Sequence, residues 1–185
     1  MENDIQKHKD KLYSQIQDEY GKLVYTYTCH FKIADRLQKR NAWIKWGQII
    51  LSAVSTGGFL GVLISNEQIL LWAGGLCSTA LLALTSYLKD KDIATEKKDH
   101  IKAANCLWKV REEYLSLLTD FDTLNAEEIM QRRNQLINRS ADIYDTAPIT
   151  DAKSYVEAQK ALKSDEEQFF TQEELNKMLP PHLRK

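Results

Sequence analysis

Residues 46–88 constrain the fold of this chain more than any other stretch. The stretch is 43 residues long and its only acidic or basic residue is Glu67, with 21 uncharged residues on each side. Each uncharged segment would rise about 31 Å as a helix, which is the thickness of the hydrocarbon core of a bilayer. The stretch therefore predicts a transmembrane helical hairpin, with spans at 46–66 and 68–88 and a turn at 66–68.

Aromatic and basic residues mark the ends of this hairpin. We expect four rings to lie at the membrane–water interfaces, namely Trp43, Trp46, Trp72 and Tyr87. Basic residues flank the spans, whereas the turn has no Lys or Arg, so the positive-inside rule makes both termini cytoplasmic. The alternative is a hydrophobic helical pair inside a water-soluble bundle, which two successive uncharged segments of this length disfavour.

Long amphipathic helices are predicted on either side of the hairpin. Apolar residues recur at spacings of three, four and seven before it, and again from Ile93 to about Thr123. No proline separates either helix from its span, so we expect each to continue into the membrane as one rod. Each apolar stripe needs a partner, and the nearest one is the other rod, as in a coiled coil.

The C-terminal part contains clear helix starts. Asn125 with Glu128, and Thr171 with Glu174, have the spacing of capping boxes. No strand-like alternation occurs, so the fold class is expected to be all-α: a two-span transmembrane hairpin with long cytoplasmic helical extensions and additional C-terminal helices. The expected organisation has four parts: an N-terminal cytoplasmic amphipathic helix at 1–45, the hairpin at 46–88, cytoplasmic helices at 89–147 and a helical tail at 148–185.

The sequence has no pattern that indicates catalysis or metal binding. The Gly-Gly pairs lie inside the predicted spans, and the acidic residues alternate with Lys and Arg as they do on solvated helix faces. Cys29, His30, His100 and Cys106 lack the paired spacing of metal ligands, so packed or surface roles are expected for them. A net charge of −1 gives no overall attraction to nucleic acid. We therefore expect no enzymatic activity, no cofactor, no metal and no direct nucleic-acid binding.

Polar and small residues within the spans are the best candidates for function. The candidate pore-lining or interhelical polar residues are Gln48, Ser52, Ser55, Thr56, Ser78, Thr79 and Ser86. The candidate close-packing residues are Gly57, Gly61 and Gly75. Such residues either let helices approach closely or line water; close packing is favoured for the glycines, and both uses stay open for Gln48 and Ser52. Because two helices cannot enclose a channel, a pore would require a homo-oligomer.

The order of these parts resembles a known family. A long polar helix leads through residues 34–40 (ADRLQKR) into Trp43 and a first span containing residues 49–56 (IILSAVST). A tight turn, a second span ending at Tyr87-Leu88 and a long helix with Glu96 and His100 follow. Over roughly residues 5 to 145, this order resembles the SMODS- and SLOG-associating two-transmembrane effector domains, abbreviated SLATT.

The resemblance implies a bacterial anti-phage effector that oligomerises and permeabilises the inner membrane, causing abortive infection. The signal would come from a cytoplasmic sensor protein or a nucleotide second messenger, and the tail after Pro148 is the obvious place for a partner contact. The alternative is a two-span membrane anchor or adaptor that presents a helical docking platform to a soluble partner enzyme. Either protein would have membrane lipid as a partner.

Overall fold

The structure is a computed structural model that describes residues 2–65, 68–89 and 92–184, with side chains described at 4–61, 68–89 and 92–184. Every regular element in these ranges is a helix, so the all-α prediction is confirmed. The elements are α1 (Glu2–Ser65), α2 (Gln68–Lys89), α3 (Ile93–Thr119), the 3-10 helix η1 (Phe121–Thr123), α4 (Ala126–Thr146), α5 (Ala152–Lys163), α6 (Gln172–Met178) and the 3-10 helix η2 (Pro181–Leu183).

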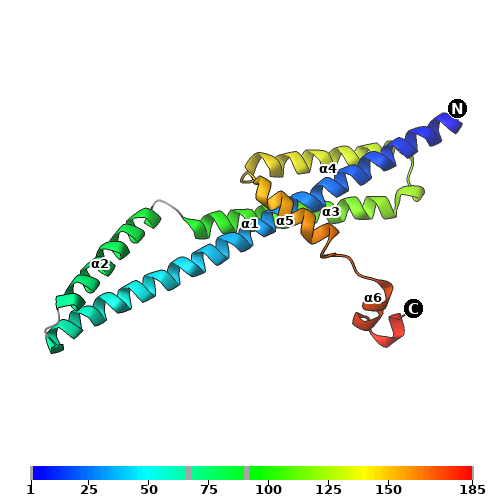
Figure 1. Cartoon of the computed structure of the whole chain (residues 1–185). Coiled ribbons are helices and arrows are strands. Elements are labelled where there is room, and N and C mark those ends of the chain that lie inside the picture. Colours follow the sequence, from blue (N-terminus) through cyan, green and yellow to red (C-terminus); the bar gives the residue numbers. More distant parts are fainter. Residues whose placement is uncertain (1, 66–67, 90–91, 185) are drawn as a thin grey trace.

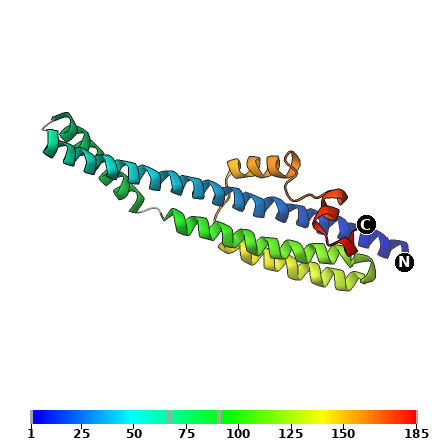
Figure 2. The same cartoon turned by 90° about the horizontal axis from the view of Figure 1, so that it is seen from below.

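Helix α1 is the axis of the molecule. Its 64 residues form one helix, about 95 Å long at the usual rise per residue, as the absence of proline predicts. Helix α2 packs against the C-terminal part of α1, while α3, α4 and α5 pack against the N-terminal part (Figure 1). The molecule is therefore elongated, with a two-helix hairpin at one end and a helical bundle at the other (Figure 2).

The second predicted rod is interrupted, so the prediction of one continuous helix from the second span onward is wrong. Helix α2 ends at Lys89 and α3 begins at Ile93. Asp92 caps α3: its carboxylate accepts a hydrogen bond from the backbone N–H of Thr95 at 2.9 Å and another from the Thr95 hydroxyl at 2.5 Å. Such a cap satisfies an N–H group that has no partner within the helix. Among the described elements, α1 alone connects the hairpin and the bundle without a break.

The core of the bundle is a seam between α1 and α3 that α4 closes. Buried residues on α3 recur at positions 100, 103, 107, 110, 114 and 117, the alternation of threes and fours found in helices that pack along their length. The residues at 107, 110, 114 and 117 form one cluster with apolar residues of α1 and α4: Leu12, Ile16, Leu23 and Tyr27, and Ile129 and Leu136. The seam therefore buries the apolar stripes of the two long helices that flank the hairpin, whose pairing the sequence predicts.

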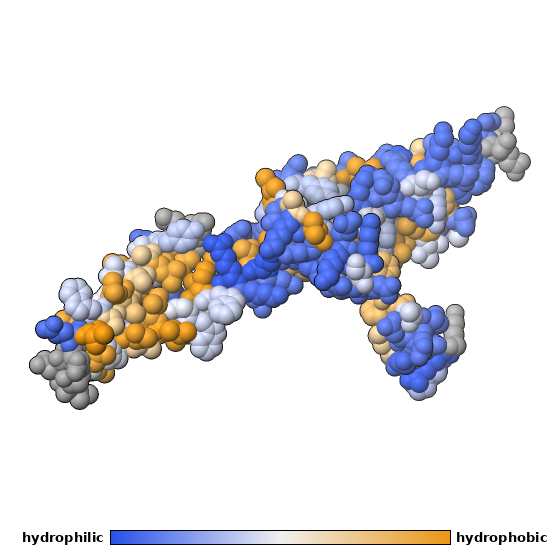
Figure 3. All heavy atoms as spheres, in the orientation of Figure 1, coloured by the Kyte–Doolittle hydropathy of each residue, from blue (hydrophilic) through white to orange (hydrophobic). Residues whose placement is uncertain are grey.

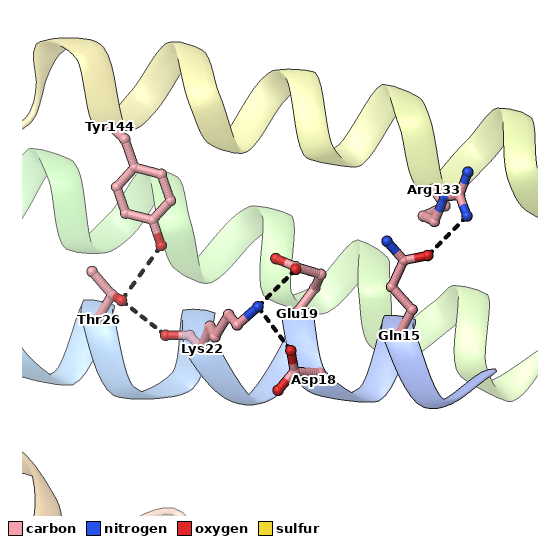
Figure 4. A network of polar contacts seen from close by, with 7 residues as sticks. All are labelled: Gln15, Asp18, Glu19, Lys22, Thr26, Arg133 and Tyr144. Carbon is pink, nitrogen blue, oxygen red and sulfur yellow. Dashed lines mark hydrogen bonds and ion pairs between the residues drawn. The ribbon is translucent and has the colours of Figure 1, made fainter. Parts of the chain in front are cut away.

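Polar contacts at the rim hold α4 against α1 (Figure 4). The guanidinium of Arg133 donates to Gln15 at 2.8 Å, and the hydroxyl of Tyr144 donates to Thr26 at 3.4 Å. Helix α4 begins at the predicted capping box, in which the side chain of Asn125 accepts from the backbone N–H of Glu128 at 2.9 Å. The predicted start of α4 is therefore confirmed.

Helix α5 lies on α1, and α6 projects from the bundle (Figure 1). Asp151 caps α5 and also forms an ion pair with Arg36 at 2.6 Å. The rings of Tyr25 and Tyr155 stack with their centroids 5.7 Å apart. Helix α6 starts at the second predicted capping box, at Thr171, which is likewise confirmed.

Candidate functional site

The hairpin exposes its apolar side chains. Gly58 and Gly74 are the only buried residues among those described at 44–61 and 68–89. The exposed large apolar side chains include Ile49, Ile50, Val54, Phe59, Leu60, Ile69, Leu71, Leu76 and Leu82. Figure 3 shows them as a hydrophobic surface at one end of the molecule, next to a mostly hydrophilic bundle. An apolar surface of this kind is unfavourable in water and is matched by lipid or by another protein.

One arm of the hairpin qualifies as a membrane span on its own. Within the part of the chain that the structure describes, one helical stretch is long and apolar enough to cross a membrane, and it begins at Gln68. The predicted two-span hairpin is thus present as a helical hairpin, while crossing by its first arm stays a prediction. The predicted turn at 66–68 includes Asn66 and Glu67, which lie outside the described residues.

The two arms approach each other closely at Gly58 and Gly61 of α1. A Cβ atom on Gly58 would lie 3.0 Å from the carbonyl oxygen of Leu70 and 3.2 Å from the Cα of Gly74. On Gly61 it would lie 2.8 Å from the Leu70 side chain. Gly57 and Gly75, for which the sequence favours close packing, instead face open space. The backbone contact therefore uses the other member of each Gly-Gly pair, because the helix phase turns Gly58 and Gly74 inward.

A weakly polar groove lies beside this contact. It has a volume of about 440 Å³ and brings together four of the candidate residues, namely Ser55, Thr56, Gly75 and Ser78, with Phe59, Leu71 and Gly74 completing its lining. The hydroxyls of Ser55 and Ser78 contact each other across the two arms. The groove shows that part of the predicted polar stripe gathers on one side of the hairpin.

The remaining polar candidates do not line the groove. Gln48 is half-buried, whereas Ser52, Thr79 and Ser86 are exposed. The hydroxyl of Thr79 donates to the carbonyl oxygen of Gly75 at 3.0 Å, so that it is satisfied within its own helix. The exposed side chains of Ser52 and Ser86 are therefore available to surroundings outside the protomer.

The predicted interface aromatics are placed at the two ends of the hairpin. Trp43 is 79% exposed, and Trp46, Trp72 and Tyr87 also have large exposed fractions. Ile44 and Leu88 pack against the same small cluster of Ile33, Leu37 and Ile93. This shared contact brings the start of the first arm and the end of the second to one level. Trp43, Trp46 and Tyr87 thus lie near the bundle, and Trp72 lies near the opposite end.

A buried histidine pair interrupts the apolar seam where the bundle approaches the hairpin. His30 on α1 and His100 on α3 are 1% and 3% exposed, and their Nδ1 atoms lie 2.8 Å apart. One ring therefore donates a hydrogen bond to the other. The pair lies between the main core, which ends at Tyr27 and Ala104, and the small cluster that contains Ile33. The sequence gives no sign of the pairing, because the two residues are 70 positions apart.

Burial keeps this pair uncharged near neutral pH. Burial, with a smaller contribution from repulsion by His100, lowers the pKa of His30 to about 4. Burial also lowers the pKa of His100, although the nearby carboxylates of Glu96, Asp151 and Asp99 oppose the shift. No group of three potential metal ligands occurs within the described residues. A neutral pair of this kind can fix the register of α1 against α3, because a shift of either helix would leave a buried nitrogen without a partner.

The segment after α5 is fastened to α1 beside the histidine pair. Lys32 forms an ion pair with Glu167 at 2.9 Å, Tyr27 donates a hydrogen bond to the Gln168 side chain, and Gln168 donates to Thr28 at 3.3 Å. Glu166 and Gln168 have positive φ values of 50° and 78°, which non-glycine residues adopt at a cost. These contacts offset that cost, so the segment at 166–168 is held in a defined conformation on α1.

Comparison with known proteins gives one match. Residues 12–174 match the model of a family described as SMODS and SLOG-associating 2TM effector domain family 4. No curated protein and no solved structure matches the chain. The matched region includes the hairpin, the histidine pair and the fastened segment after α5.

Proposed function

The chain belongs to family 4 of the SMODS- and SLOG-associating 2TM effector domains, and on this basis we propose that it is a pore-forming effector of a bacterial anti-phage system. The protein sits in the inner membrane with both termini in the cytoplasm. It is not an enzyme: on activation it oligomerises and permeabilises the membrane, which causes abortive infection.

The continuity of α1 is the observation that supports this proposal most. The same helix contributes Leu23 and Tyr27 to the buried core of the bundle and Phe59 to the exposed surface of the hairpin. A helix without a break is stiff, so a shift or rotation imposed on the bundle is carried into the hairpin. A signal received by the bundle can therefore change how the hairpin packs against its neighbours.

The exposed small residues support self-association. Gly57 and Gly75 face open space, and small residues on a membrane helix let a neighbouring helix approach closely. The hydroxyls of Ser55, Thr56 and Ser78 lie in the groove beside Gly75. In an oligomer, hydroxyls placed there face either a neighbouring copy or an aqueous lumen.

The trigger is expected to act on the bundle. A cytoplasmic sensor protein or a nucleotide second messenger would bind there and alter the packing of α1 against α3. The segment at 166–168 is well placed to respond, because it contacts Tyr27, Thr28 and Lys32 beside the histidine pair.

Dye entry and loss of membrane potential in cells that express the protein with its trigger test the proposal. The unchanged protein should admit the dye, and Gly75→Leu should abolish entry because leucine fills the space that a second copy requires. Ala80→Leu, an exposed position on another face of α2, is the matched control and should retain entry. Intact membranes together with preserved toxicity would rule the proposal out.

A second function, an anchor or adaptor, is favoured by one observation. Apolar side chains are exposed outside the hairpin as well: Ile149 is 94% exposed, and Tyr155 and Val156 on α5 are also exposed. A soluble partner could dock on them while the hairpin serves only as a tether. Replacing both arms by an unrelated membrane hairpin discriminates the two functions, because an adaptor retains its activity and a pore-forming effector loses it.

A further inference from the structure

Four basic residues surround the junction between the bundle and the hairpin. Lys39, Arg40 and Lys45 lie on α1 and Lys89 lies at the end of α2, and we call these four the basic collar. All four are exposed. Between Asp35 and Asp90 the sequence contains a single carboxylate, Glu67, near the middle of that stretch. The collar is therefore a local excess of positive charge in a chain whose net charge is only −1.

The basic collar differs from the three Lys and Arg residues that precede it most closely on α1. Lys22 pairs with Asp18 at 2.7 Å, and Lys32 and Arg36 pair with Glu167 and Asp151. Within the described residues, none of the four collar residues has a carboxylate oxygen within 4.0 Å, although Asp35 is one turn from Lys39. Among the described residues, the charge of the collar is thus not neutralised by an ion pair.

Trp43 places the collar at a defined depth. Lys39 and Arg40 precede Trp43 by four and three residues, so the three side chains lie on one face of α1. On α2, Lys89 lies near the level of Trp43, because the neighbouring residues Leu88 and Ile44 pack against the same cluster. Indole rings favour the boundary between acyl chains and headgroups. Lys39 and Arg40, one turn closer to the bundle than Trp43, then lie at the level of the headgroup phosphates.

We propose that the basic collar binds the headgroups of anionic phospholipids in the cytoplasmic leaflet, with Lys39 and Arg40 contacting a lipid phosphate and Trp43 packing against the same lipid. The inference rests on the membrane placement in the proposed function. Phosphate oxygens accept charge-assisted hydrogen bonds from ammonium and guanidinium groups, and basic residues at a bilayer surface enrich anionic lipid around them. Bound anionic lipid fixes the depth of α1 in the membrane.

Quenching of Trp43 fluorescence by brominated lipids tests the proposal. Full-length protein that retains Trp43 alone (Trp46→Phe, Trp72→Phe, Trp108→Phe) is placed in phosphatidylcholine nanodiscs containing a fixed fraction of brominated phosphatidylglycerol or, in parallel, brominated phosphatidylcholine. The anionic lipid should quench at least about twofold more strongly, and high salt should reduce this preference. Lys39→Gln with Arg40→Gln should remove the preference while retaining quenching by both lipids.

Lys7→Gln with Lys11→Gln is the matched control, since these two exposed lysines lie near the opposite end of α1. This variant should keep the preference for the anionic lipid, and circular dichroism should confirm that both variants are folded. Equal quenching of the unchanged collar by the two lipids would overturn the lipid proposal and leave the membrane placement intact. Absence of quenching by either lipid would instead place Trp43 outside the bilayer and overturn the proposed function with it.

Discussion

Two parts of α1 meet different surroundings although they belong to one helix. From Leu12 to Leu37 the apolar side chains that face α3, α4 and α5 are buried. From Ile49 to Leu60 the large apolar side chains are mostly exposed, with Ile49 at 57% and Phe59 at 61%. In the bundle the protein itself removes apolar surface from water. In the hairpin, lipid or another protein would have to remove it, so the two parts should respond differently to the same substitution.

Removing a large side chain should produce the largest difference between the two parts. Leu107 is fully buried in the bundle, so Leu107→Ala should lower the free energy of unfolding by about 2 to 5 kcal/mol, since it removes apolar contacts and leaves a cavity. Leu76 is 69% exposed on the hairpin, and Leu76→Ala should change it by less than about 1 kcal/mol. Chemical unfolding of both variants in detergent measures the two values. Equal losses would contradict the distinction between the two parts.

Adding a charge should have the opposite pattern, with a larger effect in the hairpin than in the bundle. A lysine at the middle of a membrane helix costs about 3 kcal/mol of insertion free energy, so Leu82→Lys should reduce the fraction of protein in the membrane. Val156→Lys, at a similarly exposed position in α5, should leave that fraction unchanged. Quantifying both variants in membrane and soluble fractions checks the prediction. The same distribution for the two variants would argue against lipid around the hairpin.

The histidine pair should make the stability of the bundle sensitive to pH. The pKa of His30 is about 4 in the folded protein and 6.5 in its unperturbed state, so the unfolded chain binds more protons between these values. The contribution of the neutral His30 to the free energy of unfolding is therefore complete above about pH 6.5. It is lost as the pH falls toward 4, by about 3 kcal/mol. Thermal unfolding of the bundle across this range should show the loss.

Carboxylates also titrate in the lower part of that range, so a matched variant is needed. His30→Gln with His100→Gln removes both titrating rings and keeps polar side chains in the seam. Its melting temperature should depend less on pH than that of the unchanged protein. Identical pH profiles would show that the pair is not buried in a neutral state.

The glycine contact should give the smallest effect. Gly58→Ala places a Cβ 3.0 Å from the carbonyl oxygen of Leu70 and should weaken packing of the two arms by about 1 kcal/mol, whereas Gly57→Ala adds a methyl group in open space. Cross-linking of Ser55→Cys with Ser78→Cys in a Cys77→Ser background reports this packing, because the hydroxyls at 55 and 78 touch. The disulfide yield should fall with Gly58→Ala only, and an equal fall with Gly57→Ala would contradict the contact.

Local signals in the sequence were sufficient to predict much of the fold. The capping boxes at Asn125 and Thr171 fix the starts of α4 and α6, and the absence of proline predicts the unbroken α1. The break before α3 has a local signal as well, since Asp92 and Thr95 have the spacing of an N-cap. The sequence still predicts a continuous helix there, because residues 89–92 contain neither proline nor glycine.

The contacts that depend on helix phase and on distant pairing could not be read from residue types. Gly57 and Gly58 look alike in sequence, and only the helix phase decides which one lies, with Ser55, on the face of α1 that contacts α2. His30 and His100 meet because α1 and α3 run side by side in one particular register. Gln168 contacts Tyr27 in a polar segment without glycine, where Glu166 and Gln168 adopt positive φ values that the residue types do not predict.

The placement of the hairpin in lipid is tested most directly by collision accessibility of a spin label in the reconstituted full-length protein. A label at Leu76, midway along α2, should be reached more readily by oxygen than by a water-soluble nickel chelate, because oxygen concentrates in hydrocarbon. A label at Val156 in the bundle should show the opposite order. If the nickel chelate reaches both labels equally well, lipid does not surround the hairpin and the membrane placement is wrong.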